Sequence, residues 1–207
     1  MNALDFVHRY IPSTGQSARV LLLLHGTGGD ESDLLPVGRE LDPNAALLSA
    51  RGNVSENGQP RFFRRFAEGV FDEEDVIRRA HELADFVAAA ALHYGFASDR
   101  VTALGYSNGA NIAAAIMLLR PETFSSAILF RAMVPLSQPP MGSLIGRRAF
   151  IAAGKFDPIV PLENVERLAA LMNARGAQTT LAVHDASHGL TAEDLVAARR
   201  WRALEGN

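Results

Sequence analysis

The chain has 207 residues, a length that suits one domain with a sizeable core and leaves little room for two. Hydrophobic residues make up 48% and charged residues 21%, the balance of a soluble globular protein. A net charge of −3 argues against nucleic acid or an anionic membrane as the main partner, and the lack of cysteine excludes disulfides and thiolate chemistry. We expect a cytoplasmic protein, since no signal peptide and no run long enough to span a membrane is visible.

Short apolar runs bounded by turn residues predict buried strands. In chain order they cover residues 19–24, 46–50, 101–104, 127–130, 149–153 and 179–183, with a candidate edge strand at 6–11. Apolar residues at spacings of three and four predict helices between them, within 76–94, 112–119 and 161–171 and after a capping box formed by Thr191 and Asp194. The segments 52–71 and 131–146 lack periodicity and are predicted to be loops.

Strands separated by helices pair in parallel through right-handed crossovers. We therefore predict a three-layer α/β sandwich that forms a single domain over residues 1–207. Its mostly parallel sheet has about seven strands, one for each apolar run and one for the edge segment. The chain leaves no room for a large lid domain.

Gly105-Tyr106-Ser107-Asn108-Gly109 is a G-x-S-x-G pentapeptide between a predicted strand and a predicted helix. That context places a serine on a sharp turn with its hydroxyl exposed, and glycine permits the close backbone approach that such a turn needs. Ser107 is therefore the candidate nucleophile, the alternative being an ordinary turn serine.

A serine hydroxyl needs a base within hydrogen-bond reach, and the base needs an orienting carboxylate. Asp157 and His188 each follow a predicted strand, and the chain order Ser, Asp, His is the one used by α/β-hydrolases. Because the carboxyl ends of parallel strands share one edge, we expect the three residues to meet there. Asp157 could instead only open a turn before Pro158.

The segment His25-Gly26-Thr27-Gly28-Gly29-Asp30 also follows a strand and is of the type that donates one backbone N–H to an oxyanion. We assign the two oxyanion donors to the N–H groups of Thr27 and Asn108. His25 is expected to hold this loop by hydrogen bonding. A phosphate-binding interpretation is disfavoured because the glycines lack the remaining residues of a P-loop or a dinucleotide fingerprint.

Other residues compete for these roles. Asp185 is too close to His188 along the chain to orient it, and His184 is the rival base. No His or carboxylate spacing is typical of a metal site. Phe62, Phe63 and Ile159 are candidate substrate-pocket residues, and a solvated loop with a hydrophobic anchor is the alternative for the two phenylalanines.

The chain resembles the phospholipase/carboxylesterase branch of the α/β-hydrolases, which includes the acyl-protein thioesterases, and in particular small bacterial carboxylesterases of the hydroquinone-associated type. The resemblance spans nearly the whole chain. Its landmarks are residues 23–30, 49–52, 62–65, 105–110, 157–161 and 187–190. It implies ester hydrolysis without a metal or organic cofactor, with Ser107 as nucleophile, His188 as base and Asp157 as its orienting partner. Acyl-protein thioesterases usually have glutamine where this chain has Asn108, which argues against a protein-thioester substrate.

The sequence thus predicts a serine carboxylesterase for small soluble esters that works through an acyl-enzyme. The alternatives are a thioesterase or lysophospholipase with the same residues, and a non-catalytic ligand-binding protein on a hydrolase scaffold. A dienelactone hydrolase is disfavoured because its cysteine nucleophile is absent. The predicted partner is a small-molecule ester, with no nucleic acid and no membrane span, and a homodimer through a helical face is left open.

Overall fold

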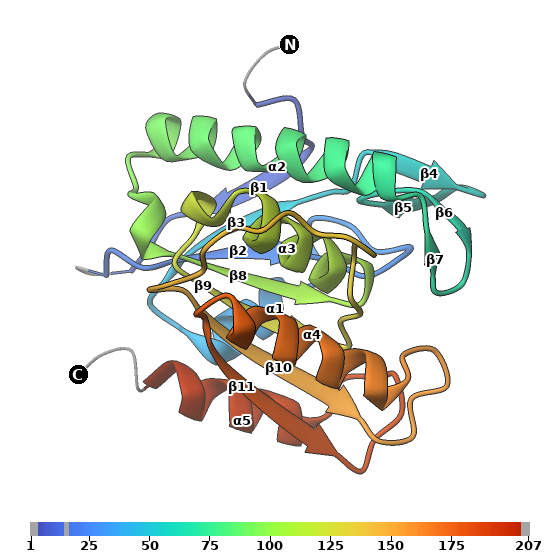
Figure 1. Cartoon of the computed structure of the whole chain (residues 1–207). Helices are drawn as coiled ribbons and strands as arrows, with labels where there is room; N and C mark the ends of the chain where they lie inside the picture. Colours follow the sequence, from blue (N-terminus) through green and yellow to red (C-terminus); the bar gives the residue numbers. More distant parts are fainter. Residues whose placement is uncertain (1–3, 15–16, 204–207) are drawn as a thin grey trace.

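The computed structural model describes residues 4–14 and 17–203, and its centre is a seven-stranded sheet with helices on both faces (Figure 1). The strand order is β1-β3-β2-β8-β9-β10-β11, and all neighbours pair in parallel except β1 and β3. The strands are β1 (His8–Ile11), β2 (Val20–Leu24), β3 (Ala46–Ala50), β8 (Val101–Tyr106), β9 (Ser126–Phe130), β10 (Arg148–Gly154) and β11 (Gln178–His184). The predicted fold class and the predicted strands are confirmed.

Helices cover the two faces of the sheet unequally. The helices are α1 (Leu35–Leu41), α2 (Glu73–Tyr94), α3 (Asn108–Leu119), α4 (Leu162–Ala174) and α5 (Ala192–Ala203), with short 3-10 turns at η1 (Ser98–Arg100) and η2 (Pro121–Thr123). Helices α2, α3 and α4 bury the larger apolar cluster, and α1 and α5 bury the smaller one. Strand β2 contributes Leu22 and Leu24 to the first cluster and Leu21 and Leu23 to the second, which explains why it is apolar at every position.

The prediction of a loop over residues 52–71 was wrong in part. This segment contains two small antiparallel hairpins, β4 (Val54–Glu56) with β5 (Gln59–Arg61) and β6 (Arg65–Ala67) with β7 (Val70–Phe71). Asn57 and Gly58 join the first pair with φ values of 53° and 81°, as a two-residue hairpin turn requires. Strands of two or three residues are too short to produce a recognisable alternation. The 131–146 segment has neither helix nor strand, as predicted.

Helix α1 was missed by the sequence-based prediction, whereas the start of α5 agrees with it. Helix α1 was not predicted, because it has only seven residues and contains Pro36 and Gly38. A Cβ at Gly38 would lie 3.1 Å from the Leu23 side chain, so the glycine lets this helix pack closely on the sheet. The capping box of α5 is confirmed: Asp194 N–H donates to Thr191 Oγ1 at 3.3 Å, and Thr191 N–H donates to Asp194 Oδ2 at 2.8 Å.

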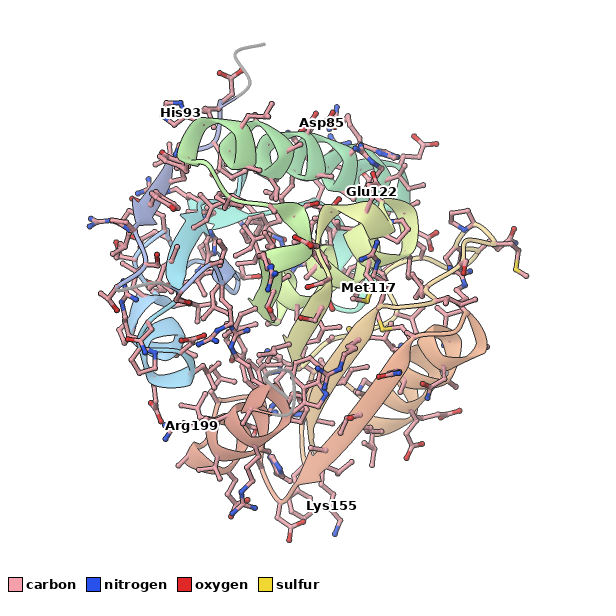
Figure 2. The ribbon with its side chains drawn as sticks, turned by 90° about the vertical axis from the view of Figure 1, so that its left-hand side faces the viewer. Asp85, His93, Met117, Glu122, Lys155 and Arg199 are labelled. Carbon is pink, nitrogen blue, oxygen red and sulfur yellow. The ribbon has the colours of Figure 1, made fainter. Side chains whose placement is uncertain are left out.

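Many charged side chains lie on the outside of the molecule, among them Asp85, Lys155 and Arg199, which Figure 2 labels. Asp85 on α2 and Glu122 lie near each other, and Arg120 pairs with both, at 3.0 Å and 2.5 Å. Such exposed pairs add little stability. Within residues 4–14 and 17–203, none of the helices combines the length and the apolar character needed to cross a membrane.

Candidate active site

Ser107 lies on the sharp turn between β8 and α3. Its backbone has φ 51° and ψ −113°, a strained conformation for a residue with a side chain. The two flanking glycines make the turn possible, because a Cβ at Gly105 would lie 2.5 Å from the Gly109 carbonyl oxygen and a Cβ at Gly109 would lie 1.9 Å from the Leu24 carbonyl oxygen. The serine N–H donates to the Phe130 carbonyl at 2.9 Å, which ties the turn to the neighbouring strand β9.

The structure brings the other two predicted catalytic residues to this serine. His188 Nε2 lies 3.0 Å from Ser107 Oγ, and His188 Nδ1 lies 2.8 Å from Asp157 Oδ2. A carboxylate only accepts hydrogen bonds, so Nδ1 carries the proton and Nε2 is free to accept the serine proton. The three side chains come from the carboxyl ends of β8, β10 and β11, the shared edge that the parallel topology predicts.

The N–H groups predicted to bind the oxyanion are unoccupied by the protein itself. Among the described residues, neither the Thr27 nor the Asn108 backbone N–H has a hydrogen-bond partner. The close packing of Gly109 against Leu24 and His25 brings the first turn of α3 beside the loop that contains Thr27. The N-terminal end of a helix also favours a negative charge. This arrangement can stabilise an oxyanion formed at the serine.

His25 holds the loop that contains the predicted donor Thr27 by hydrogen bonds at both ring nitrogens. Its side chain is buried, Nδ1 donates to the Gly26 carbonyl at 2.6 Å, and Nε2 accepts from the Gly52 N–H at 3.0 Å. Burial lowers the pKa of His25, although its bond to Gly26 and nearby carboxylates oppose this. Both ring nitrogens are therefore used by the neutral imidazole, in the loop-holding role that the sequence indicates.

A second segment, residues 60–62, is hydrogen-bonded to both chain segments that carry the predicted oxyanion donors. The Asn108 Oδ1 atom accepts from the Phe62 N–H at 2.7 Å, and the Pro60 carbonyl accepts from the Gly28 N–H at 3.0 Å. The buried Arg61 donates to Thr27 Oγ1 at 2.8 Å. The residue after the serine and the oxyanion loop are thus both fixed to one short stretch of chain, a contact that the sequence analysis did not foresee.

The candidate pocket residues are less accessible than the sequence suggested. Phe62 is 2% exposed and packs against His25 with ring centroids 4.8 Å apart, while Phe63 is 0% exposed and packs edge-on against Phe71. Ile159 is half-buried against the larger apolar cluster. Contact of these residues with substrate stays a prediction, and in this structure both phenylalanine rings belong to the core.

The rival residues have other partners. His184 Nδ1 donates to Asp194 Oδ1 at 2.8 Å, and Asp185 is exposed and pairs with Lys155. Arg131, which is fully buried beside Asp194, was not predicted from the sequence. Its signal was present, since Arg131 is the lone charge in the apolar stretch from 127 to 136.

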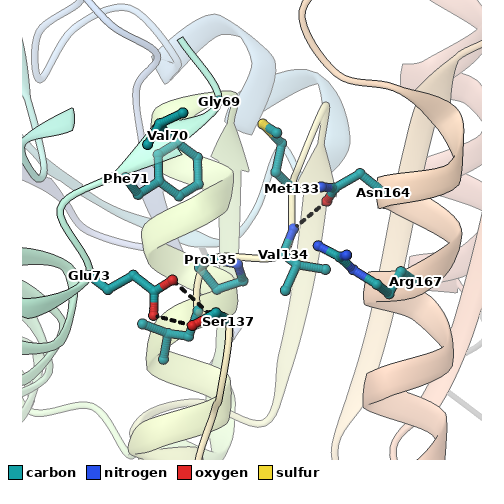
Figure 3. Close-up of a pocket in the computed structure, with 11 residues that line it drawn as sticks. Gly69, Val70, Phe71, Glu73, Met133, Val134, Pro135, Ser137, Asn164 and Arg167 are labelled. Carbon is teal, nitrogen blue, oxygen red and sulfur yellow. Dashed lines mark hydrogen bonds between the residues drawn. The ribbon is translucent and has the colours of Figure 1, made fainter. Parts of the chain in front are cut away.

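Two cavities flank the sheet edge. One of about 320 Å³ is lined mainly by apolar groups, with the oxyanion-loop residue Thr27, Tyr106 next to the serine, and Leu190 near His188. The other, of about 200 Å³, lies between the β6–β7 hairpin, the loop after β9 and helix α4 (Figure 3). Within the described part of the chain, no group of three or more His or carboxylate side chains could hold a metal ion.

A mostly parallel sheet that carries a serine on a strained strand-to-helix turn, with a histidine and an aspartate from later loops, defines the α/β-hydrolase class. A model of the phospholipase/carboxylesterase family matches residues 8–201, and the chain belongs to this family of hydrolytic enzymes.

Individual relatives agree with this assignment. The chain is 46% identical over 193 residues to the Bacillus subtilis (strain 168) protein named "Putative hydrolase MhqD", covering 93% of this chain and 96% of that one. The crystal structure of the Bacillus cereus carboxylesterase superposes with a TM-score of 0.94 at 44% identity, covering 97% and 94%. A carboxylesterase from Mesorhizobium loti gives a TM-score of 0.93 at 33% identity, covering 100% and 98%.

Proposed function

We propose that the chain is a serine carboxylesterase that hydrolyses small soluble carboxylic esters through an acyl-enzyme on Ser107. The observation that carries this proposal is the hydrogen-bonded series Ser107–His188–Asp157, with distances of 3.0 Å and 2.8 Å. The carboxylesterases among its relatives support the substrate class.

In the first half of the reaction, Ser107 Oγ attacks the ester carbonyl while His188 Nε2 takes its proton. Asp157 stays ionised and stabilises the imidazolium that forms. The Nε2–H then protonates the leaving alcohol, which departs as the acyl-serine ester forms. In the second half, His188 activates a water molecule that attacks the acyl group, and the acid leaves as the proton returns to Ser107.

The Thr27 and Asn108 N–H groups would receive the negative oxygen of each tetrahedral intermediate. Because they belong to backbone segments held by His25, Arg61 and the Asn108 side chain, they need little reorganisation during the reaction. Removing one such donor from a serine hydrolase typically costs about 3 kcal/mol of transition-state stabilisation.

The larger cavity indicates the size of one ester substituent. Its volume of about 320 Å³ is near the lower end of ligand pockets, so it suits a compact group. Its lining includes Tyr106, whose ring centroid lies 5.5 Å from that of His188, and Leu190, two positions after His188, so the cavity adjoins the group that would protonate the leaving alcohol. We assign this cavity to the alcohol portion of the ester.

Two alternatives use the same scaffold. A thioesterase or lysophospholipase would share the three side chains and differ in pocket shape. A non-catalytic binding protein would keep the fold without turnover, but ligand binding alone does not require the hydrogen-bonded series Ser107–His188–Asp157. Cytoplasmic location and a homodimer stay predictions.

A panel of p-nitrophenyl esters and matched thioesters of increasing acyl length tests the proposal, with Ser107→Ala as the control. We expect turnover that is highest for short acyl chains and falls at least about 10³-fold in the alanine variant. Turnover of thioesters alone would favour the thioesterase, and no turnover of either would favour the binding protein.

A further inference from the structure

Arg131 is a buried cation that the proposed reaction does not use. It directly follows β9, its side chain has 0% exposed area, and its backbone φ is +58°. A buried arginine needs partners, and this one forms a two-pronged ion pair with Asp194 at 3.0 Å and 2.7 Å. Its left-handed backbone persists only if the surroundings hold it.

The same guanidinium holds the loop that carries His188. Arg131 Nε donates to the Ser187 carbonyl at 3.1 Å, and Arg131 Nη2 donates to the Gly189 carbonyl at 2.9 Å. The carbonyl between them, that of His188, accepts from the Tyr106 hydroxyl at 3.2 Å. The carbonyls of three consecutive residues, Ser187, His188 and Gly189, are therefore held by the side chains of Arg131 and Tyr106.

Both side chains are anchored beside the nucleophile. Tyr106 immediately precedes Ser107, and the residue before Arg131, Phe130, accepts the Ser107 N–H at 2.9 Å. The Arg131 N–H donates to the Ala152 carbonyl on β10 at 3.0 Å. The ends of three neighbouring strands and the histidine loop are thus joined through Arg131.

Asp194 fixes the guanidinium and balances its charge. It accepts from Arg131, from the Thr191 N–H and from His184 Nδ1, and so joins the start of α5 to this network. An unbalanced positive charge here would oppose the imidazolium that forms on His188 during the reaction.

We propose that Arg131 is a positioning residue that sets the distance between Ser107 Oγ and His188 Nε2, with Asp194 orienting it and Tyr106 completing the support. It touches neither reacting atom. This inference rests on the proposed roles of Ser107 and His188.

Arg131→Lys tests the inference, because lysine keeps the charge and most of the stem but has no planar fork to reach two carbonyls and a carboxylate. Arg202→Lys is the matched control. Arg202, near the end of α5, is also buried and paired, with Asp42 at 2.8 Å and Thr102 at 2.9 Å. Thr102 lies at the amino end of β8, and Ser107 follows the opposite end of that strand.

We expect Arg131→Lys to lower kcat by about 100-fold with KM changed less than about threefold, because small displacements of reacting groups affect the chemical step most. Arg202→Lys should lower the melting temperature without this loss of kcat. Thermal unfolding followed by circular dichroism shows whether each variant is folded at the assay temperature, and the rate of labelling by a fluorophosphonate should fall in parallel with kcat.

A folded Arg131→Lys variant with wild-type kcat, or an equal loss of kcat in Arg202→Lys, would overturn the inference. If Arg131→Lys does not fold, Tyr106→Phe decides: it keeps the ring that lines the larger cavity and removes the hydroxyl that donates to the His188 carbonyl, and we expect kcat to fall about tenfold with KM nearly unchanged. Wild-type kcat in Tyr106→Phe would then overturn the inference. A wild-type enzyme that neither hydrolyses esters nor reacts with the probe would contradict the proposed function itself.

Discussion

The carboxylate of Asp157 divides its two oxygens between the backbone and His188. Oδ1 accepts from the N–H groups of Ile159 and Val160 at 2.8 Å and 3.0 Å, and Oδ2 lies 2.8 Å from His188 Nδ1. The aspartate thus both forms a turn and orients the histidine, so the two interpretations of its sequence context are compatible. With Oδ1 engaged, Oδ2 has little freedom to turn away from the imidazole.

Asp157→Asn should keep the turn and lose the orientation. The amide oxygen can still accept from the backbone, which leaves the NH₂ group facing His188 Nδ1 and favours the wrong tautomer. We expect kcat for p-nitrophenyl acetate to fall about 10³- to 10⁴-fold with the melting temperature nearly unchanged. Asp185→Asn is the control, since Asp185 is exposed on the same rim and should be silent; an equal loss in both variants would contradict the assignment.

Gly109→Ala should prevent normal folding of the turn that carries Ser107. The added Cβ would lie 1.9 Å from a backbone oxygen of Leu24, and no side-chain rotation can relieve that contact. We expect a destabilisation of more than about 3 kcal/mol, or a fall in melting temperature of roughly 10 °C. Gly142→Ala is the control, because its nearest neighbour would be 3.6 Å away. A Gly109→Ala protein with the same melting temperature as the wild type would show that the backbone contact is not this close.

Asp33 should influence which alcohol groups the larger cavity accepts. Among residues 4–14 and 17–203, it is the only charged residue that lines that cavity, and its carboxylate has no ion-pair or hydrogen-bond partner there. We expect the wild type to prefer an ester of a cationic alcohol over its neutral isostere by about two- to fivefold in kcat/KM at low salt, less at high salt. Asp33→Asn should remove the preference and Glu40→Gln, outside the cavity, should not. The same preference in all three proteins would contradict our assignment of this cavity.

Asp42 should make the free energy of unfolding depend on pH in the acid range. Burial raises its pKa, but hydrogen bonds and charge from Arg19 and Arg202 outweigh this and lower the pKa from 3.8 to about 2. Because the unfolded chain takes up the proton more readily, the carboxylate stabilises the fold above about pH 4, and this is lost as pH falls towards 2. The shift corresponds to about 2 kcal/mol, and about half of it should be lost by pH 3.

Urea unfolding of the wild type and of Asp42→Asn between pH 3 and pH 7 measures the contribution of the Asp42 carboxylate to the free energy of unfolding. The difference in free energy of unfolding should be largest near neutral pH and shrink below pH 4. A difference that stays constant over this range would mean that the Asp42 carboxylate is not preferentially stabilised in the folded state.

The sequence was sufficient where the determining interactions are local. The continuous apolar runs of β2 and the glycines around Ser107 are read from a few neighbouring residues, and both match the structure. The capping box of α5 is local in the same way. The choice of His188 over His184 needed chain order and a neighbouring glycine, and the structure gives His184 a separate partner in Asp194.

The parts that sequence reasoning missed are those set by contacts between distant segments. Arg131 and Asp194 are 63 positions apart, and neither has a local pattern that predicts the pairing. The hairpins in 52–71 are too short to show a period, although Asn57-Gly58 is a known turn signal that could have revealed the first. The burial of Phe62 follows from its packing against His25 and that of Phe63 from its packing against Phe71, and their aromatic and basic neighbours in the sequence indicate neither contact.

Peptide mapping after reaction with a fluorophosphonate shows directly whether His188 makes Ser107 nucleophilic. We expect a covalent adduct on Ser107 in the wild type, loss of ester hydrolysis in proportion to labelling, and no adduct in Ser107→Ala. An unlabelled wild-type protein, or an adduct on a different serine with hydrolysis retained in Ser107→Ala, would contradict this expectation.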